Sequence, residues 1–321
     1  SYNKSNLFIK IKDYYGYLAI FLLLFSFWHS LISDKTKRIF KIVNTFLWIS
    51  IISLFAVFVM HTYALGLRWK ITDHAPWSNG YEALTFISWG TVLAGFLFIR
   101  SSKITLAGTS LLAFFILMTA GHSSFDPQLT NLQPVLKSYW LMIHVACITI
   151  SYGFLGLGFI LGLINVCNYL FLKSGSKNLK TIISELTYVN EMTLTIGLAL
   201  ATIGTFLGGI WANESWGRYW GWDAKETWAL VIVLTYAVVL HLRLIPGLKS
   251  KFIFNVASIL SFSSVLMTFI GVNYYLSKGL HSYARGETPA FPLWAWITIF
   301  SIFGIIIMAW YNKKRLKAVT S

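Results

Sequence analysis

Long apolar runs recur along the whole chain, and they constrain its fold more than any other feature. Each has roughly the length of 18 or more residues that an α-helix needs to cross a bilayer. Charged residues make up only 12% of the chain, against about a quarter in soluble domains. We therefore expect an all-α, polytopic transmembrane helix bundle of about nine spans. The predicted spans are 14–33, 41–65, 82–99, 104–120, 139–172, 192–210, 224–242, 252–274 and 292–311.

Basic residues divide the predicted loops into two classes. The formal net charge is +15, and most Lys and Arg residues form short clusters after every second span. This pattern favours the positive-inside rule over nucleic-acid binding. It places Ser1 outside and Ser321 inside, with Lys10, Lys12, Arg68 and Lys70 as exceptions. The outer loops, rich in Trp, Pro, Gly and His, are then 66–81, 121–138, 211–223 and 275–291.

The chain shows neither an internal repeat nor a low-complexity linker, so we expect residues 1–321 to form a single transmembrane domain. An outer N-terminus would suit the C-terminal part of a larger fusion that begins with an external domain. Cys147 and Cys167 lie 20 residues apart in one predicted span. On one helix that is about 30 Å, too far for a disulfide. No Cys-x-x-Cys motif occurs, which argues against thiol-redox chemistry.

The densest chemical feature is the segment from Trp211 to Trp228. It holds five of the 14 tryptophans, together with Gly217, Gly221 and charges of both signs. One interpretation is an interfacial aromatic belt, which is common in membrane proteins. The other is an apolar platform for a flat ligand, since glycine lets backbone and rings approach closely. A belt needs fewer tryptophans, and we favour the platform.

The end of this segment has the form of a helix start. Asp223 and Glu226 have the spacing of a capping box, which makes them more typical of a helix N-terminus than of catalytic acids. Arg218 and Lys225 either pair with carboxylates of a ligand, such as haem propionates, or face water.

Histidines supply candidate iron ligands. His144 and His281 are predicted on the same outer side as the Trp-rich segment, which would allow bis-histidine ligation of a haem. His241 ends the seventh span at cytoplasmic depth, and His29 lies at a similar depth in the first span. These two are candidates for a second site, with His29 the weaker one. His61, His74 and His122 are interpreted as structural.

These residues carry a family resemblance. The segment 216–228 resembles the tryptophan-rich WWD signature of haem-handling proteins, and the chain from about residue 60 onward is similar to the CcsA (ResC) family of System II cytochrome c biogenesis. His144 and His281 match the external histidines of that family, and His241 matches its transmembrane histidine. The stretch Pro76–Glu82 resembles another family segment.

The resemblance implies a cytochrome c haem lyase component in a bacterial inner membrane, with its active face in the periplasm. Haem b would cross from a transmembrane site at His241 to an external site with His144 and His281 as axial ligands. There it would be joined to the Cys-x-x-Cys-His motif of apocytochrome c. A ResB (CcsB) partner, separate or fused, would supply the second ligand for His241. The expected haem contacts are Trp216, Arg218, Trp220, Trp222 and Asp223.

Two other functions remain open from the residues alone. A subunit with permanent b-type haems for electron transfer would also need paired histidines, but it would not pass haem to an apocytochrome. A transporter of another solute would be expected to have broken helices at the midplane, and the sequence shows no clear pair of these.

Overall fold

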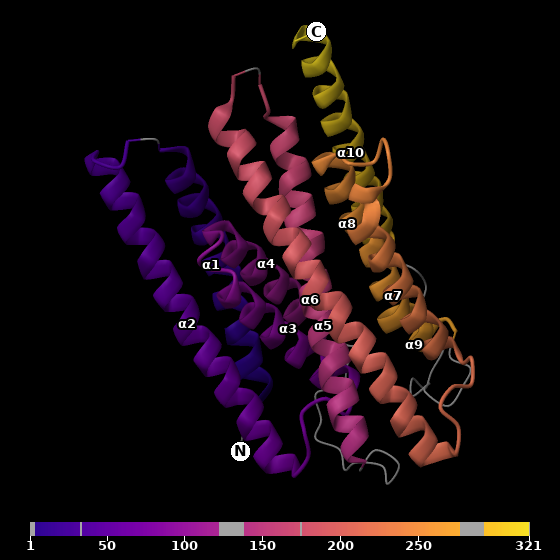
Figure 1. Cartoon of the computed structure of the whole chain (residues 1–321). Helices are drawn as coiled ribbons and strands as arrows, with labels where there is room; N and C mark the ends of the chain where they lie inside the picture. The colour runs from indigo at the N-terminus through magenta and orange to yellow at the C-terminus, as the bar shows by residue number, and fades with distance from the viewer. Residues whose placement is uncertain (1–3, 33, 122–137, 174, 277–291, 321) are drawn as a thin grey trace. The chain divides into compact units, whose positions relative to one another are not determined.

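A computed structural model shows that the chain folds into long α-helices (Figure 1). It describes residues 4–32, 34–121, 138–173, 175–276 and 292–320. Every regular element within these ranges is helical, which confirms the predicted all-α, polytopic fold. The elements are α1 (Lys4–Leu31), α2 (Arg38–Thr72), α3 (Gly80–Leu97), α4 (Lys103–Ala120), α5 (Tyr139–Leu170), α6 (Lys177–Trp216), α7 (Ala224–His241), the 3-10 turn η2 (Leu242–Leu244), α8 (Lys251–Leu266), the π-helical η3 (Met267–Gly271), α9 (Val272–Tyr274) and α10 (Leu293–Thr320).

Each predicted span corresponds to one of these helical segments and extends past its ends by at most two residues. Among the described residues, seven segments are long and apolar enough to cross a membrane, and α1 and α3 are not among the seven. The fifth span is a single helix of 32 residues, as predicted. The predicted bounds of 192–210 were too short, because α6 extends over 40 residues. Its two ends carry polar residues, so an apolar run marks only the middle of the helix.

Contacts within the chain group into two compact units. Unit 1 comprises Ser1–Leu157 and Ala199–Trp220, and unit 2 comprises Gly158–Leu198 and Gly221–Ser321. The long helices α5 and α6 therefore contribute to both units. The Trp-rich segment also begins in unit 1 and ends in unit 2.

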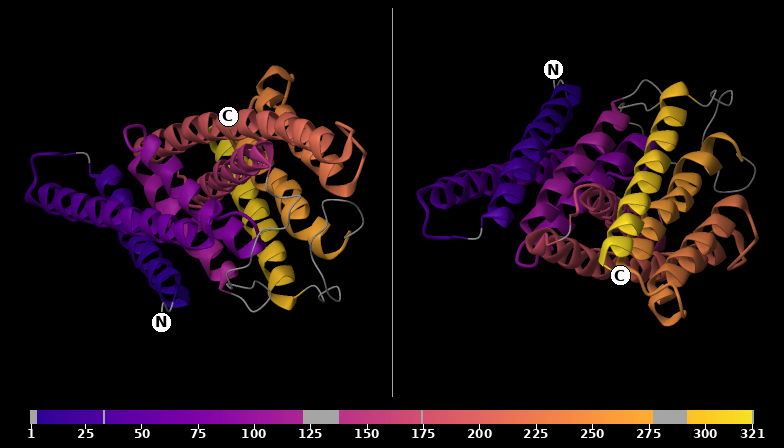
Figure 2. Two further views of the ribbon diagram at one scale, coloured as in Figure 1. Left: turned by 90° about the horizontal axis from the view of Figure 1, so that it is seen from below. Right: turned by 90° about the horizontal axis from the view of Figure 1, so that it is seen from above.

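The first four helices pack together in unit 1. Helix α1 packs against α2 and α4, and α3 packs against α4. Both views in Figure 2 show α1 and α2, in indigo, side by side. Leu54 and Leu106 are fully buried, as is Tyr15. The Tyr15 hydroxyl lies 3.1 Å from Nδ1 of the buried His61, which supports the structural interpretation of that histidine.

A buried ion pair links the end of α2 to the start of α3 in unit 1. Arg68 Nε donates to Glu82 Oε1 at 2.7 Å, and both side chains are only 1% exposed. The other carboxylate oxygen of Glu82 accepts hydrogen bonds from the backbone N–H and hydroxyl of Ser78. Arg68 is thus neutralised inside the protein. This explains why it departs from the positive-inside pattern.

Unit 2 is held together by a polar cluster between α5, α6 and α8. Asn165, Asn190 and Asn255, one from each helix, are all fully buried. The amide groups of Asn165 and Asn190 both donate to Asn255 Oδ1, at 3.3 and 3.1 Å. Hydrogen bonds between helices are a recognised source of association inside membranes, where apolar burial gives little specificity.

Glycines on α5 allow this cluster to form. A Cβ atom at Gly158 would overlap the Leu194 side chain of α6, and one at Gly162 would overlap the Ser258 hydroxyl of α8. The two glycines are four residues apart and so lie on one face of the helix. Small residues at this spacing let helix backbones approach closely in membranes.

A side chain of helix α10 caps the C-terminus of α5 in the same unit. The Asn312 amide donates to the carbonyls of Tyr169, Leu170 and Leu172 at 2.8, 3.2 and 3.0 Å. These carbonyls lie at the C-terminus of α5, where intrahelical partners are lacking. A single side chain therefore caps this helix end.

The buried ion pair predicts an asymmetric response to mutation. Arg68→Leu or Glu82→Leu alone should destabilise unit 1 by about 3–5 kcal/mol, because each leaves one buried charge without its partner. The double variant should be less damaged than either single variant. Thermal unfolding of the detergent-purified protein measures this, with Lys70→Ala, an exposed neighbour, as the control. A double variant as unstable as the singles would contradict the pairing.

Candidate functional site

His144 is held by a backbone carbonyl of the neighbouring helix in unit 1. Its Nδ1 atom lies 2.6 Å from the carbonyl oxygen of Gly204 on α6. A carbonyl can only accept, so Nδ1 carries the proton in this hydrogen bond. In a neutral imidazole the lone pair is then on Nε2, which is the arrangement typical of a metal-ligating histidine.

The same face of α6 shapes the space around the His144 ring. Gly204, Gly208 and Trp211 are spaced four and three residues apart, so they line one side of the helix. A Cβ atom at Gly208 would come within 2.6 Å of His144 Cε1. The ring of Trp211 lies nearly parallel to the imidazole, with centroids 6.4 Å apart and planes 12° apart.

A second tryptophan extends this aromatic surface. The rings of Trp211 and Trp216 meet edge to face, with centroids 4.7 Å apart. Trp211 is 1% exposed, whereas Trp216 is half-buried. His144 is therefore next to a continuous aromatic wall that belongs to its own unit, and the wall includes a predicted haem contact.

The end of α6 is fixed by local contacts in unit 1. The Ser138 hydroxyl donates to Glu214 Oε2 at 2.6 Å, which ties the start of α5 to the last turns of α6. Gly217 has a φ of 72° and donates its N–H to the Asn213 carbonyl at 2.8 Å. This left-handed glycine is a common way to end a helix. Arg218 and Trp220, both half-buried, follow it in the same unit.

The predicted capping box is confirmed at the start of α7. Asp223 Oδ1 accepts from the N–H of Glu226 at 2.9 Å, and Glu226 Oε2 accepts from the N–H of Asp223 at 3.3 Å. The same Glu226 oxygen also accepts from the N–H of Gly221 at 2.6 Å. Sequence reasoning found the cap but missed this third hydrogen bond, which fixes the backbone on both sides of Trp222.

Trp222 has an unusual backbone in unit 2. Its φ is 56°, in the left-handed region that bulky residues rarely adopt. Its side chain is 71% exposed. Strained backbone of this kind costs about 1–3 kcal/mol and is typically found at functional sites.

His241 resembles His144 in the way that its ring is held. It ends α7 in unit 2, is exposed, and its Nδ1 lies 2.7 Å from the carbonyl of Ala237 in the same helix. The lone pair is therefore on Nε2 here as well. His29, the weaker candidate, lies in the last turn of α1 in unit 1, with its ring 4.8 Å from that of Phe40.

The structure thus brings some of the predicted site residues together. Within unit 1, His144 and Trp216 share one aromatic cluster through Trp211, and Arg218 and Trp220 follow directly. Sequence reasoning missed Gly204, which contacts the His144 ring, and Gly208, which leaves space for it. Their roles depend on how α6 packs against α5, which the sequence does not show. Two predicted residues, His281 and the structural His122, lie outside the described part of the chain. Trp222, Asp223 and His241 lie in unit 2.

Comparison with known proteins identifies the family. Residues 77–281 match the family described as cytochrome C assembly protein. The chain belongs to this family. The matched range contains the whole Trp-rich segment and ends at His281, so the predicted resemblance to CcsA is confirmed.

Individual relatives span most of the chain. It is 42% identical over 290 residues to Protein NrfI of Wolinella succinogenes, covering 89% of this chain and 31% of NrfI. It is 31% identical to the cytochrome c biogenesis protein CcsA of Guillardia theta, covering 83% and 93% of the two chains. For CcsA of Chlamydomonas reinhardtii the identity is 34%, with coverage of 68% and 64%. In NrfI, the similar segment is therefore a minor part of a longer protein.

The capping box predicts a specific pattern of backbone exchange. Asp223→Ala should loosen the first turn of α7 by about 1 kcal/mol, whereas Asp223→Asn should leave it intact, because Asn is an equally good N-cap. Hydrogen exchange at the Glu226 and Thr227 amides measures the difference. Equal exchange in the two variants would show that the Asp223 side chain does not hold the turn.

Proposed function

We propose that this chain binds haem and presents it for attachment to apocytochrome c. The supporting observation is the geometry of His144, whose Nδ1–H bond to Gly204 places the lone pair on Nε2, the nitrogen that would ligate iron. Trp211 and Trp216 supply an aromatic wall beside the ring. Arg218 is a cation that can pair with a propionate. These residue types fit a flat, dianionic iron porphyrin.

The second axial ligand in this proposal is His281. It lies at the end of the family match, in the last predicted outer loop. Trp220, Trp222 and Asp223 complete the proposed surroundings of the haem, with Asp223 acting through the helix cap. Family membership in cytochrome c assembly makes haem the expected ligand, since it is the group that c-type cytochromes carry.

The proposed chemistry needs placement more than acid–base catalysis. Each cysteine thiol of a Cys-x-x-Cys-His motif adds across a haem vinyl group: a C–S bond forms, and the hydrogen goes to the other vinyl carbon. No net oxidation or reduction occurs. Holding the two reactants in the correct orientation lowers the barrier by several kcal/mol. The protein's role is therefore to bind haem in one orientation and to release it after attachment.

We propose His241 as a ligand of a second, transmembrane haem site. Its exposed position at the end of α7, with Nδ1 held by Ala237, suits a ring that faces another polypeptide segment. A ResB (CcsB) type of partner, separate or fused, would supply the opposite ligand, and His29 remains the weaker alternative. In the proposed orientation this site is near the cytoplasmic face of a bacterial inner membrane, and the His144 site faces the periplasm.

Absorption spectroscopy tests the external site. The protein purified from haem-sufficient cells should show a bis-histidine, b-type spectrum, which should weaken in His144→Ala and in His281→Ala. Both variants should still insert in the membrane but should fail to assemble c-type cytochromes. Normal cytochrome c levels in both would refute the assignment. Bound haem that never passes to an apocytochrome would point instead to a fixed electron-transfer subunit.

A glycine variant tests the geometry of the site without removing a ligand. Gly208→Ala should displace the His144 ring, because the new methyl group would come within 2.6 Å of it. We expect haem occupancy to fall several-fold while membrane insertion is retained. Gly66→Ala is the matched control, since it also lies within a long helix and a Cβ atom there meets nothing within 4 Å. Equal haem occupancy in the two variants would contradict the proposed position of His144.

A further inference from the structure

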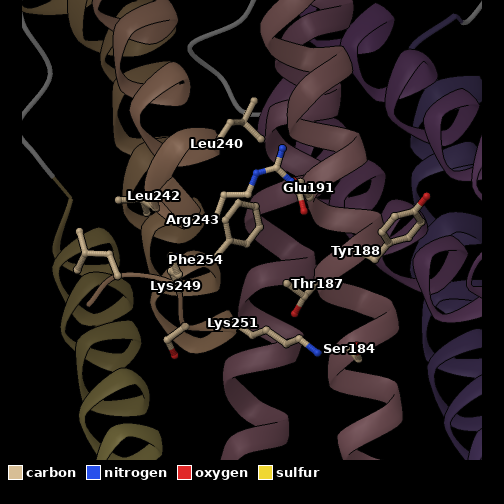
Figure 3. Close-up of a pocket in the computed structure, with 12 residues that line it drawn as sticks. Ser184, Thr187, Tyr188, Glu191, Leu240, Leu242, Arg243, Lys249, Lys251 and Phe254 are labelled. Carbon is tan, nitrogen blue, oxygen red and sulfur yellow. Dashed lines mark hydrogen bonds and ion pairs between the residues drawn. The ribbon is translucent and has the colours of Figure 1, made fainter. Parts of the chain in front are cut away.

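Unit 2 contains a pocket that the proposed haem chemistry does not use. Its volume is about 280 Å³, and it is lined by α6, by the end of α7 with the turn that follows it, and by the first turn of α8 (Figure 3). Its lining includes three cations, Arg243, Lys249 and Lys251, and one acidic residue, Glu191. The formal charge of the lining is therefore +2.

Two of the cations reach across the pocket toward α6. Arg243 Nη1 lies 2.5 Å from Glu191 Oε1, and Lys251 Nζ donates to the Ser184 hydroxyl at 2.7 Å. Figure 3 shows both side chains extending from the α7–α8 side. The Arg243 side chain is 70% exposed, and a guanidinium has five N–H donors. Among the described residues it contacts one carboxylate, that of Glu191, so its other N–H groups can bind a further anion.

The pocket lies where two candidate spans end. Helices α7 and α8 both belong to apolar segments that can cross a membrane, and the turn between them carries the basic residues. Large apolar side chains lie exposed beside it: Leu244 is 67% exposed, Tyr188 59% and Ile245 43%. Cations at a span end next to exposed apolar surface suit an amphiphile with an anionic head and an apolar tail. A free anion would gain nothing from the apolar surface.

We propose that this pocket binds the phosphate headgroup of an anionic phospholipid. Arg243, Lys249 and Lys251 provide the positive charge, and the acyl chains lie along the exposed apolar face of α7. The positive-inside pattern assigns this turn to the cytoplasmic leaflet. The bound lipid would stabilise the turn that begins directly after His241.

Lipid retention in nanodiscs tests the proposal on the full chain. The protein is passed through discs of phosphatidylglycerol mixed with phosphatidylcholine, released, and analysed by native mass spectrometry. We expect phosphatidylglycerol to be retained about tenfold over its share in the disc, since each nearby cation adds to the attraction. Lys249→Gln/Lys251→Gln should lose most of this preference. Lys177→Gln/Lys180→Gln, which removes the same charge outside the pocket lining, should not.

A substitution of Glu191 should change phosphatidylglycerol retention in the opposite direction. Glu191→Gln removes the one acidic group of the lining, so phosphatidylglycerol retention should rise, although an ion pair is lost. Arg243→Gln should lower retention and provides a second loss-of-binding variant if the double lysine variant folds poorly.

Three outcomes would overturn the proposal. The first is equal retention of the two lipids by the unmodified chain. The second is equal retention by the pocket variant and the Lys177/Lys180 control. The third is displacement of phosphatidylglycerol by millimolar inorganic phosphate, which would make the pocket a free-anion site. The haem absorbance that depends on His144 reports the proposed haem function independently in the same samples, because none of these substitutions replaces a residue of the His144 cluster.

Discussion

The lack of water inside a bilayer governs how this chain arranges its polar groups. A buried polar group without a hydrogen-bond partner costs several kcal/mol in such surroundings, and a charge costs more. Arg68 and Glu82 meet this requirement as an ion pair in which each side chain is only 1% exposed. The amide N–H groups of Asn165 and Asn190 meet it by donating to Asn255 Oδ1, a contact that joins three helices. The contacts that satisfy these groups also specify which helices pack together.

The need for hydrogen-bond partners also orients the rings of the two proposed haem ligands, His144 and His241. A helix carbonyl is the acceptor for Nδ1 at both His144 and His241, although one carbonyl belongs to a neighbouring helix and the other to the histidine's own helix. Each bond orients the ring and fixes which nitrogen carries the proton. Ligand preorganisation of this kind normally comes from groups just outside the metal site. Here it comes from backbone that the fold supplies in any case.

The sequence predicted the features that depend on local pattern. Apolar runs located every long helix, and the spacing of Asp223 and Glu226 predicted the capping box that begins α7. Two kinds of feature were not predictable: helix ends whose sequence is polar, and contacts that depend on the register between neighbouring helices. The N-terminal part of α6 is polar, so hydropathy alone placed its start 15 residues too late. Likewise, nothing local marks Gly208 as the residue that makes room for His144, or Arg68 as a buried cation.

The backbone of the Trp-rich segment bears on the choice between a belt and a platform. An interfacial belt needs only that indole rings reach the membrane surface, and ordinary helix ends achieve this without strain. Trp222 instead has a φ of 56° while its side chain is 71% exposed. Glu226 fixes the N–H groups on either side of it, at Gly221 and Asp223. A strained conformation of this kind persists only where the surrounding structure holds it, and such residues cluster at functional sites. An indole that only marks the membrane surface does not need a strained backbone, so Trp222 supports the ligand platform that we propose.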